Sequence, residues 1–140
     1  MRIRSTGIVI HDNKLLMIHR FRDGKEYYVL PGGGVEEGES PQEAVVREVK
    51  EETSIKSRLN SELALFSHSY TADKGEESIH QLFLCEYISG TPALQQDSVE
   101  KMRADHNNIY DPMWVDLDRL ESMTIWPVET KKWLTEYLKK

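Results

Sequence analysis

The chain has 140 residues, the usual size of one domain, so we expect a single domain over residues 1–140. Hydrophobic residues make up 39% of it, which with 8 glycines is typical of a globular protein and excludes a disordered or collagen-like chain. The net charge of −6 argues against sequence-independent binding of nucleic-acid phosphates as the main task.

Two antiparallel strands are expected at the start of the chain. Residues 2–10 and 14–21 are rich in β-branched and apolar side chains. The turn-forming triplet His11-Asp12-Asn13 lies between them, a pattern typical of a β-hairpin.

A glycine-rich loop and a capped helix are expected next. Residues 22–26 form a polar loop, and residues 27–30 form a short strand that Pro31 and three glycines end. Residues 40–43 combine a capping box with proline at the first helical position, so a helix begins there and runs to about Thr53.

The second half of the chain has weaker patterns. Strands are expected around residues 62–69 and over residues 78–88. Residues 93–112 are polar and irregular, and they fit either a long loop or a loop with a short helix near residues 99–104.

The last part of the chain alternates short elements. Residues 113–115 are expected as a short strand, residues 117–122 as a helical turn, and residues 127–140 as a terminal helix. Trp126 and Trp133 are interpreted as packing residues.

Cysteine content and hydropathy point to a reducing, aqueous compartment. Cys85 is the only cysteine, which leaves no intrachain disulfide and no cysteine-rich zinc site. The first residues hold only a three-residue apolar run, Ile8-Val9-Ile10, and nowhere do about 18 apolar residues follow one another. We therefore expect a cytoplasmic protein with no membrane partner.

Three carboxylates are expected to crowd one side of the predicted helix near its end. On a helical wheel Glu48, Glu51 and Glu52 share one arc beside the apolar side. Their mutual repulsion and the negative end of the helix dipole both disfavour this arrangement. Either they form a solvated acidic face, with Arg47 in an ordinary surface ion pair, or a divalent cation relieves the repulsion. Oxygen ligands favour Mg²⁺ or Mn²⁺ over zinc or copper.

The glycines before the helix are a second candidate feature. Residues 32–34 form either a simple tight turn or a place where another group approaches the backbone closely. They are not a Walker A loop, because no Gly-Lys-Ser/Thr follows, and they do not have the dinucleotide-binding spacing.

Together the glycines and the acidic helix match a longer pattern. In order along the chain, its fixed positions are Gly33, Glu39, Arg47, Glu48, Val49, Glu51, Glu52 and Ile55. Their spacing resembles the Nudix box, G-x5-E-x7-R-E-U-x-E-E-x-G-U, in which U is bulky and apolar. The one departure is Ser54, where the family pattern has glycine. A left-handed serine after a helix costs about 1 kcal/mol relative to glycine.

The resemblance implies an α/β (α+β) fold, a Nudix-type α/β/α sandwich with a mixed β-sheet. It implies an Mg²⁺-dependent pyrophosphohydrolase, with Mn²⁺ as a substitute, that cleaves a nucleoside diphosphate linked to another moiety by water attack on phosphorus. The expected partner is a small nucleotide and not a nucleic-acid polymer, and a homodimer is a family-level expectation. The alternative is a non-catalytic nucleotide-sensing domain of the same fold.

Similarity to the family also assigns the metal ligands. Glu48 and Glu52 are the first choices, Glu51 is a ligand or the base that orients water, and the carbonyl of Gly32 is a backbone ligand. Family members differ in which glutamate is the base, so Glu48 and Glu51 both stay open for that role.

Further catalytic residues would support these ligands. Arg47 would orient Glu51 across one helical turn, and Glu39 would brace the loop or the arginine. Many family members recruit another carboxylate from a later loop, for which the candidates are Asp111, Glu100 and Asp105.

The residues assigned to substrate binding are Arg20, Arg22, Tyr28, Gly33 and Gly34. Both arginines could pair with phosphate oxygens or form a solvated strand end. Either Tyr27 or Tyr28 could stack on a base, while strand alternation directs one of the two into the core. His68 and His80 are expected to face each other across neighbouring strands, as satisfied imidazoles or as catalytic ones.

Overall fold

The computed structural model describes residues 2–71, 75–94 and 108–139. The strands are β1 (Arg2–His11), β2 (Lys14–Arg22), β3 (Lys25–Val29), β4 (Gly32–Gly34), β5 (Lys56–Leu59), β6 (Phe66–Thr71), β7 (Glu77–Ser89) and β8 (Asn108–Asp116). The helices are α1 (Pro41–Thr53), the 3₁₀ helix η1 (Leu117–Ser122) and α3 (Val128–Leu138). Within these described ranges, no helix has the length and apolar character that crossing a membrane requires.

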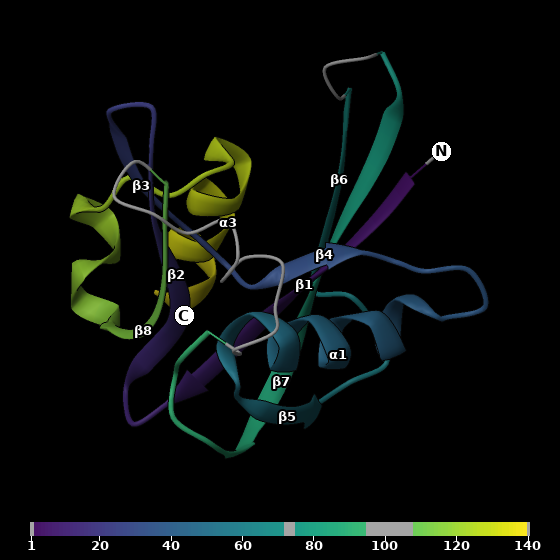
Figure 1. Ribbon diagram of the computed structural model, residues 1–140, viewed down its shortest axis with the longest axis horizontal. Coiled ribbons are helices and arrows are strands. Elements are labelled where there is room, and N and C mark those ends of the chain that lie inside the picture. The colour runs from purple at the N-terminus through teal and green to yellow at the C-terminus, as the bar shows by residue number, and fades with distance from the viewer. Residues whose placement is uncertain (1, 72–74, 95–107, 140) are drawn as a thin grey trace.

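The strands form one mixed sheet, as expected (Figure 1). Its main order is β3-β2-β1-β7-β5, while β4 joins at β1, β6 at β7 and β8 at β2. The strands β1 and β7 pair in parallel over most of their length, and the other pairs are antiparallel. Because β7 follows β1 only after α1, β5 and β6, this parallel pair brings the two halves of the chain together.

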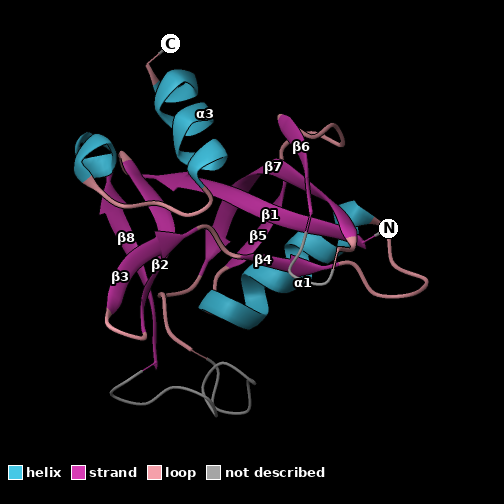
Figure 2. Cartoon of the chain, turned by 90° about the horizontal axis from the view of Figure 1, so that it is seen from above, coloured by secondary structure: helices cyan, strands magenta, loops and turns pink. Residues whose placement is uncertain are grey.

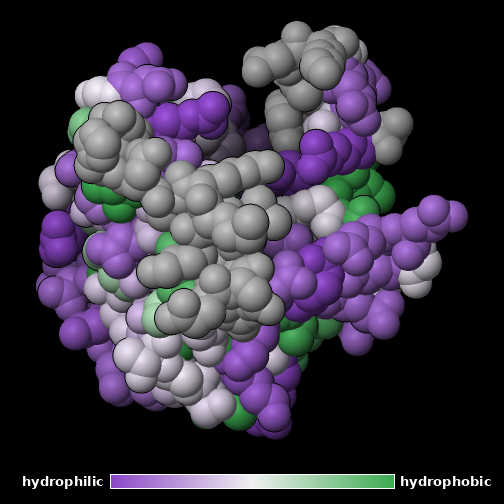
Figure 3. Space-filling model, viewed as in Figure 1, coloured by the Kyte–Doolittle hydropathy of each residue, from purple (hydrophilic) through white to green (hydrophobic). Residues whose placement is uncertain are grey.

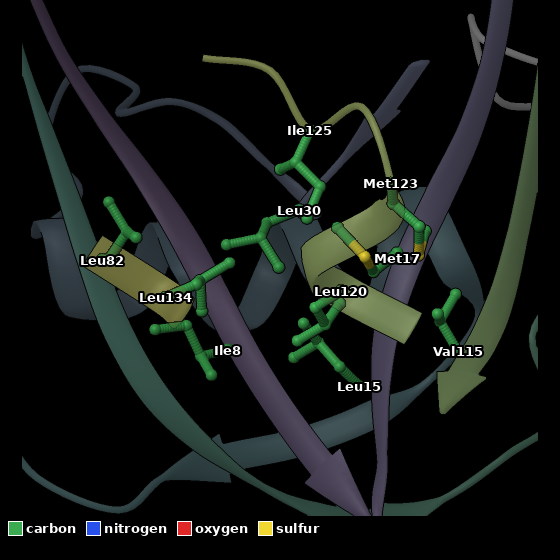
Figure 4. Packing of buried hydrophobic residues seen from close by; sticks show 10 residues of the cluster. All are labelled: Ile8, Leu15, Met17, Leu30, Leu82, Val115, Leu120, Met123, Ile125 and Leu134. Atoms are coloured by element: carbon green, nitrogen blue, oxygen red, sulfur yellow. The ribbon is translucent and has the colours of Figure 1, made fainter. Parts of the chain in front are cut away.

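Helices lie on both faces of the sheet, with α1 on one side and α3 on the other (Figure 2). Successive residues of β1 point to opposite faces, so Ile8 packs toward α3 and Val9 toward α1. The cluster on the α3 side includes Leu134 from that helix, and Figure 4 shows its side chains converging. The cluster on the α1 side includes Val45 and Val49 from that helix. These two cores make the predicted α/β/α sandwich.

The N-terminal hairpin is confirmed, but the glycine triplet differs from expectation. Asp12 and Asn13 both have positive φ, of 52° and 63°, as a two-residue hairpin turn requires. Gly32–Gly34, expected either as a tight turn or as a place where another group approaches the backbone closely, form the short strand β4 along β1. Glycine is poor in strands, yet a Cβ at Gly32 would lie 2.4 Å from the carbonyl oxygen of Ser5, so no larger residue fits this close pairing.

Three strand predictions in the second half need correction. β6 begins at Phe66 and not near residue 62, and the edge strand β5 was missed because its inward position is the polar Ser57. β8 begins at Asn108, so residues 108–112, expected as irregular, are strand. Pro112 is tolerated there because β8 pairs with β2 alone, at the edge of the sheet. The helix expected near residues 99–104 lies outside the described residues.

The predicted helical turn and terminal helix are confirmed as η1 and α3, whereas the two tryptophans differ from each other. Trp133 packs as expected, with its ring stacked between those of Phe66 and Tyr137. Trp126 was expected to pack as well, but it is 60% exposed. It lies just before α3, where backbone bonds to Tyr28 hold the chain along the outer edge of β3.

Candidate functional site

Local sequence signals position helix α1 beside the glycine strand. The hydroxyl of Ser40 accepts a hydrogen bond from the N–H of Glu43, whose carboxylate accepts one from the N–H of Ser40, so the predicted capping box is present. The Ser5 hydroxyl donates to the carbonyl of Pro41 at 2.8 Å, which ties β1 to the first residue of the helix.

The helix ends at the departure from the family pattern. Ser54 takes the left-handed conformation expected of a glycine, with φ of 67° and ψ of 8°. Its N–H still donates to the carbonyl of Lys50, and its hydroxyl donates to the carbonyl of Ala93 at 2.7 Å. The last turn, with Glu51 and Glu52, therefore stays helical.

Arg47 is the centre of an acidic cluster. Its Nε and Nη2 donate to the two carboxylate oxygens of Glu39 at 2.7 and 2.9 Å, a bidentate pair. Its Nη1 donates to Glu48 at 2.8 Å and to Glu51 at 3.1 Å. Its Nη2 also donates to the carbonyl of Gly34 at 3.1 Å, so one guanidinium links β4 to three carboxylates. The side chains of Arg47, Glu39 and Glu48 are only 23, 16 and 14% exposed, which strengthens these contacts.

The cluster depends on the ionised form of Glu39. The guanidinium of Arg47 holds the pKa of this carboxyl below its ordinary value of 4.5, with help from the N–H of Glu36, and the same pairing raises the pKa of Arg47. A carboxyl whose pKa is lowered by folding stabilises the fold above its unfolded-state pKa. This contribution is lost as the pH falls through the lower, folded-state pKa, so the cluster weakens in acid.

Two carboxylates of α1 contact the glycine strand directly. The N–H of Gly32 donates to a carboxylate oxygen of Glu52 at 2.7 Å. At the next residue, a Cβ on Gly33 would lie 2.5 Å from the carboxylate carbon of Glu48. Glu48 and Glu52 lie one helical turn apart, so both reach the same short strand.

We expect Gly33→Ala to lower kcat/KM about a hundredfold while the chain still folds. The added methyl group occupies the space of the Glu48 carboxylate and displaces it, and small misplacements of reacting groups cost about this much. Steady-state kinetics on a nucleotide, the substrate class that the resemblance implies, measure the effect, and circular dichroism checks the fold. A wild-type rate in the folded variant would show that the position of Glu48 is unimportant.

The donor set suits a hard divalent cation. Carboxylate oxygens and backbone carbonyls are the ligands that Mg²⁺ takes, and Glu48, Glu52 and the carbonyl of Gly32 supply them around β4. Among the described residues, no three His, Cys, Asp or Glu side chains form a ready-made metal cluster, and Arg47 engages several of the carboxylates. Glu48 and Glu52 are the two carboxylates that reach β4, so they are the side chains that could hold a cation beside its backbone.

Most residues assigned from the sequence lie together, in and around β4 and α1. The loop that joins these elements projects to one side in Figure 1 and is hydrophilic on the face drawn in Figure 3. Arg20 lies elsewhere, because its guanidinium donates to Asn108 and to the carbonyl of Ile109 and stacks 3.6 Å above the ring centre of Tyr110. Arg22 is exposed at the end of the β2–β3 hairpin, beside Asp23.

The remaining candidates are dispersed. Tyr28 packs against the core on the α3 side and its ring lies 4.9 Å from that of His19, so it is the tyrosine that alternation directs inward. Asp111 is exposed on β8, and Glu100 and Asp105 lie outside the described residues.

A series of hydrogen-bonded polar side chains begins at Thr6, which pairs with β4, and the sequence predicted only part of it. His68 and His80 face each other as expected, with ring nitrogens 3.1 Å apart, and His80 also hydrogen-bonds to the hydroxyl of Thr6. Burial lowers the pKa of His80 to about 4, with help from His68 and Arg4. Thr6 pairs with Gly32 in the sheet, a contact that alternation along β1 could not identify because it depends on which strand lies beside it.

Comparison with known proteins gives a match along nearly the whole chain. The family model described as NUDIX domain matches residues 1–136. The chain is 39% identical over 104 residues to an ADP-ribose pyrophosphatase of Methanocaldococcus jannaschii, an alignment that covers 74% of this chain and 61% of that protein. It is 27% identical over 136 residues to an RNA pyrophosphohydrolase of Pelagibacter ubique, covering 85% of this chain and 79% of that protein.

Solved structures show the same fold. The chain superposes on the MutT protein from Methanosarcina mazei Go1 with a TM-score of 0.72, covering 99% of this chain and 93% of that one. At 20% identity this similarity shows the arrangement of strands and helices, and nothing finer.

Proposed function

The chain belongs to the NUDIX domain family, and from this membership we propose that it is a divalent-cation-dependent pyrophosphohydrolase of a small nucleotide. The bond cleaved would be the anhydride of a nucleoside diphosphate linked to another moiety. Support comes from the names of its relatives, which include an ADP-ribose pyrophosphatase and an RNA pyrophosphohydrolase.

The chemistry follows from the charge of the substrate. A pyrophosphate repels hydroxide, so hydrolysis requires positive charge on the phosphoryl oxygens and a positioned water. Glu48 and Glu52, with the carbonyl of Gly32, would hold Mg²⁺ or Mn²⁺. Bound there, the cation would neutralise phosphoryl oxygens and lower the pKa of water.

The other acidic residues would then divide the remaining tasks. Glu51 is half-exposed and keeps one contact to Arg47, so it is free to accept a proton from water as general base or to orient that water. Glu48 is the alternative base. Glu39 and Gly34 fix the guanidinium of Arg47, and through it the direction of Glu51.

One observation carries this proposal: Glu48 and Glu52 both reach the side-chain-free backbone of β4, so two carboxylates of α1 converge on one short strand. A cluster that only solvated the helix would have no need of such a strand.

A substrate panel tests the proposal. It contains nucleoside triphosphates, ADP-ribose, dinucleoside polyphosphates, sugar nucleotides and a 5′-triphosphorylated RNA oligonucleotide, each with and without Mg²⁺ or Mn²⁺. We expect phosphate, pyrophosphate or nucleoside monophosphate release from at least one small nucleotide, and only with the cation. Cleavage of the RNA alone would replace the small nucleotide with an RNA end as substrate. No turnover of any compound would contradict the proposal and favour the alternative, a non-catalytic nucleotide-sensing domain of the same fold.

A further inference from the structure

Two arginines at the start of β1 lack an acidic partner among the described residues. Arg2 is exposed and Arg4 is half-buried, and they lie two residues apart on the same face of the strand. Neither guanidinium forms a hydrogen bond or an ion pair to residues in the ranges 2–71, 75–94 and 108–139, whereas Arg47 and Arg58 each form several. Because β1 is an interior strand, paired with β4 and β7, these charges do not protect an exposed sheet edge.

Two histidines continue from Arg4 across the sheet. The register places Arg4 opposite His80 of β7, and His80 opposite His68 of β6, so the three side chains share one face. It is the face that packs on α3, because Leu82 and Phe66 in the next row belong to that core. The start of β1 itself lies away from α3 (Figures 1 and 2). We call Arg2, Arg4, His68 and His80 the arginine patch.

The charge of Arg4 acts on the buried end of the arginine patch. Burial is the main cause that lowers the pKa of His80 to about 4, and Arg4 and His68 contribute to this shift. The whole chain has a net charge of −6, so two arginines without acidic partners among the described residues make a local positive site on an acidic protein. An anion would be attracted to this site.

The arginine patch and the acidic cluster lie on opposite faces of β4. A Cβ on Gly34 would lie 3.1 Å from a guanidinium nitrogen of Arg2, whereas a Cβ on Gly33 would meet the carboxylate of Glu48. Successive residues of a strand face opposite sides, and their Cα atoms are about 3.8 Å apart. Only a strand without side chains therefore separates the patch from the carboxylates that would hold the cation.

We propose that the arginine patch binds a multiply charged phosphate. A guanidinium donates two parallel hydrogen bonds to phosphate oxygens, and two guanidiniums on one face match an anion with several oxygens and more than one charge. The choice of phosphate over other anions rests on the proposed function, because every substrate of a pyrophosphohydrolase carries phosphate. The phosphate bound is either part of the nucleotide, beyond the diphosphate that is cleaved, or a free ion.

Calorimetry with inorganic tripolyphosphate in EDTA tests the proposal without turnover, because without a cation the carboxylates of α1 repel the anion. We expect the wild type to bind tripolyphosphate, and Arg2→Met and Arg4→Met each to bind it about tenfold more weakly, the usual effect of losing one charge-assisted contact. Arg119→Met is the matched control. Arg119 is an exposed arginine on η1, so this variant has the same change in net charge and should bind like the wild type.

Histidine ring signals in NMR spectra locate the bound anion. On titration with tripolyphosphate at constant pH, the ring protons of His68 should shift, while those of His11, at the other end of β1, should not. Since Arg2 is exposed, Arg2→Met is expected to fold, and circular dichroism verifies this for both variants. No binding by the wild type, unchanged affinity in the folded Arg2→Met and Arg4→Met variants, or no shift at His68 would each overturn the proposal.

Kinetics with Mg²⁺ identify the source of the phosphate. If the patch holds a phosphate of the nucleotide, Arg4→Met should raise KM about tenfold for a dinucleoside polyphosphate and leave KM within about twofold for ADP-ribose, which has no phosphate beyond its diphosphate. If the patch holds free phosphate, added phosphate should change the rate of the wild type and not that of Arg4→Met, with both KM values unchanged.

The same measurements separate this inference from the proposed function. If tripolyphosphate binds as expected but no nucleotide is cleaved, the arginine patch stands and the hydrolase proposal fails. If nucleotides are cleaved but both arginine variants bind tripolyphosphate like the wild type, only the proposal for the patch fails.

Discussion

Glu52→Gln is expected to lower turnover about a thousandfold and to leave the fold intact. Glutamine has the shape of glutamate and keeps an oxygen that can accept the hydrogen bond from the N–H of Gly32. It loses the negative charge with which Glu52 would hold a divalent cation, and the cation supplies most of the charge stabilisation in phosphoryl transfer. Initial rates at saturating Mg²⁺, on the best substrate of the panel, measure the loss.

The control for this prediction is Glu37→Gln. Glu37 is exposed in the loop between β4 and α1. It carries the same carboxylate as Glu52, but it does not make the hydrogen bond to β4 that Glu52 makes. It should hydrolyse at the wild-type rate. An undiminished rate for Glu52→Gln at saturating Mg²⁺ would show that Glu52 is not a metal ligand, and a thermal unfolding midpoint close to wild type confirms that the variant is folded.

Arg47→Met is expected to lower both stability and activity. The methionine fills much of the space of the arginine, but the carboxylates of Glu39, Glu48 and Glu51 then lose the positively charged guanidinium that all three contact. Removal of one partner from a largely buried ion pair destabilises by about 3 kcal/mol, and the partial exposure of Glu51 reduces this to about 2 kcal/mol. We also expect kcat to fall about a hundredfold, because Glu51 loses the contact that orients it.

Urea unfolding at two pH values tests the electrostatic origin of this effect. At pH 7 the carboxylates are ionised and the full difference in unfolding free energy between wild type and variant is expected. As the pH falls below 4.5, the lowered pKa of Glu39 means that wild type loses stabilisation, while the variant is relieved of repulsion, so the difference should narrow. A difference that is independent of pH would point to packing instead.

Arg58→Met provides the comparison. Arg58 also forms a bidentate pair, with Glu86, but both side chains are more than half exposed. Solvent screens such a pair, so this variant should unfold much closer to wild type than Arg47→Met.

Local signals in the sequence predicted the elements that carry the site. The start of α1 was predictable because the capping box, from Ser40 to Glu43, and Pro41 act within one turn. The long strands β1, β2 and β7 were predictable from their apolar, β-branched side chains. By contrast, β5 places the polar Ser57 inward and β8 contains Pro112, so each lacks the pattern of an ordinary strand.

The nearest neighbours of the site residues could be predicted only where they are close in sequence. Arg47 and Glu51 are one helical turn apart, and their contact follows from helix geometry. The contact of Glu48 with Gly33 requires β4 to pair with β1 while α1 packs on that sheet, which no local pattern indicates. The stacking of Arg20 on Tyr110 likewise depends on the pairing of β2 with β8.

The exposure of Trp126 could not be predicted for the same reason, because it depends on contacts between segments that are far apart in the sequence. A tryptophan beside a predicted helix is usually part of the core, and its place at the open edge of β3 is set by the backbone bonds between residues 124–126 and Tyr28.

Direct measurement of cation binding decides whether the carboxylates of α1 form a metal site. Titration of the protein with Mn²⁺, followed by the electron paramagnetic resonance signal of the free ion, gives the affinity without any substrate or turnover. We expect wild type and Glu37→Gln to bind Mn²⁺ equally, and Glu48→Gln and Glu52→Gln each to bind it at least about tenfold more weakly, because each loses one charged ligand. Equal Mn²⁺ affinity in all four proteins would contradict the assignment of Glu48 and Glu52 as the ligands.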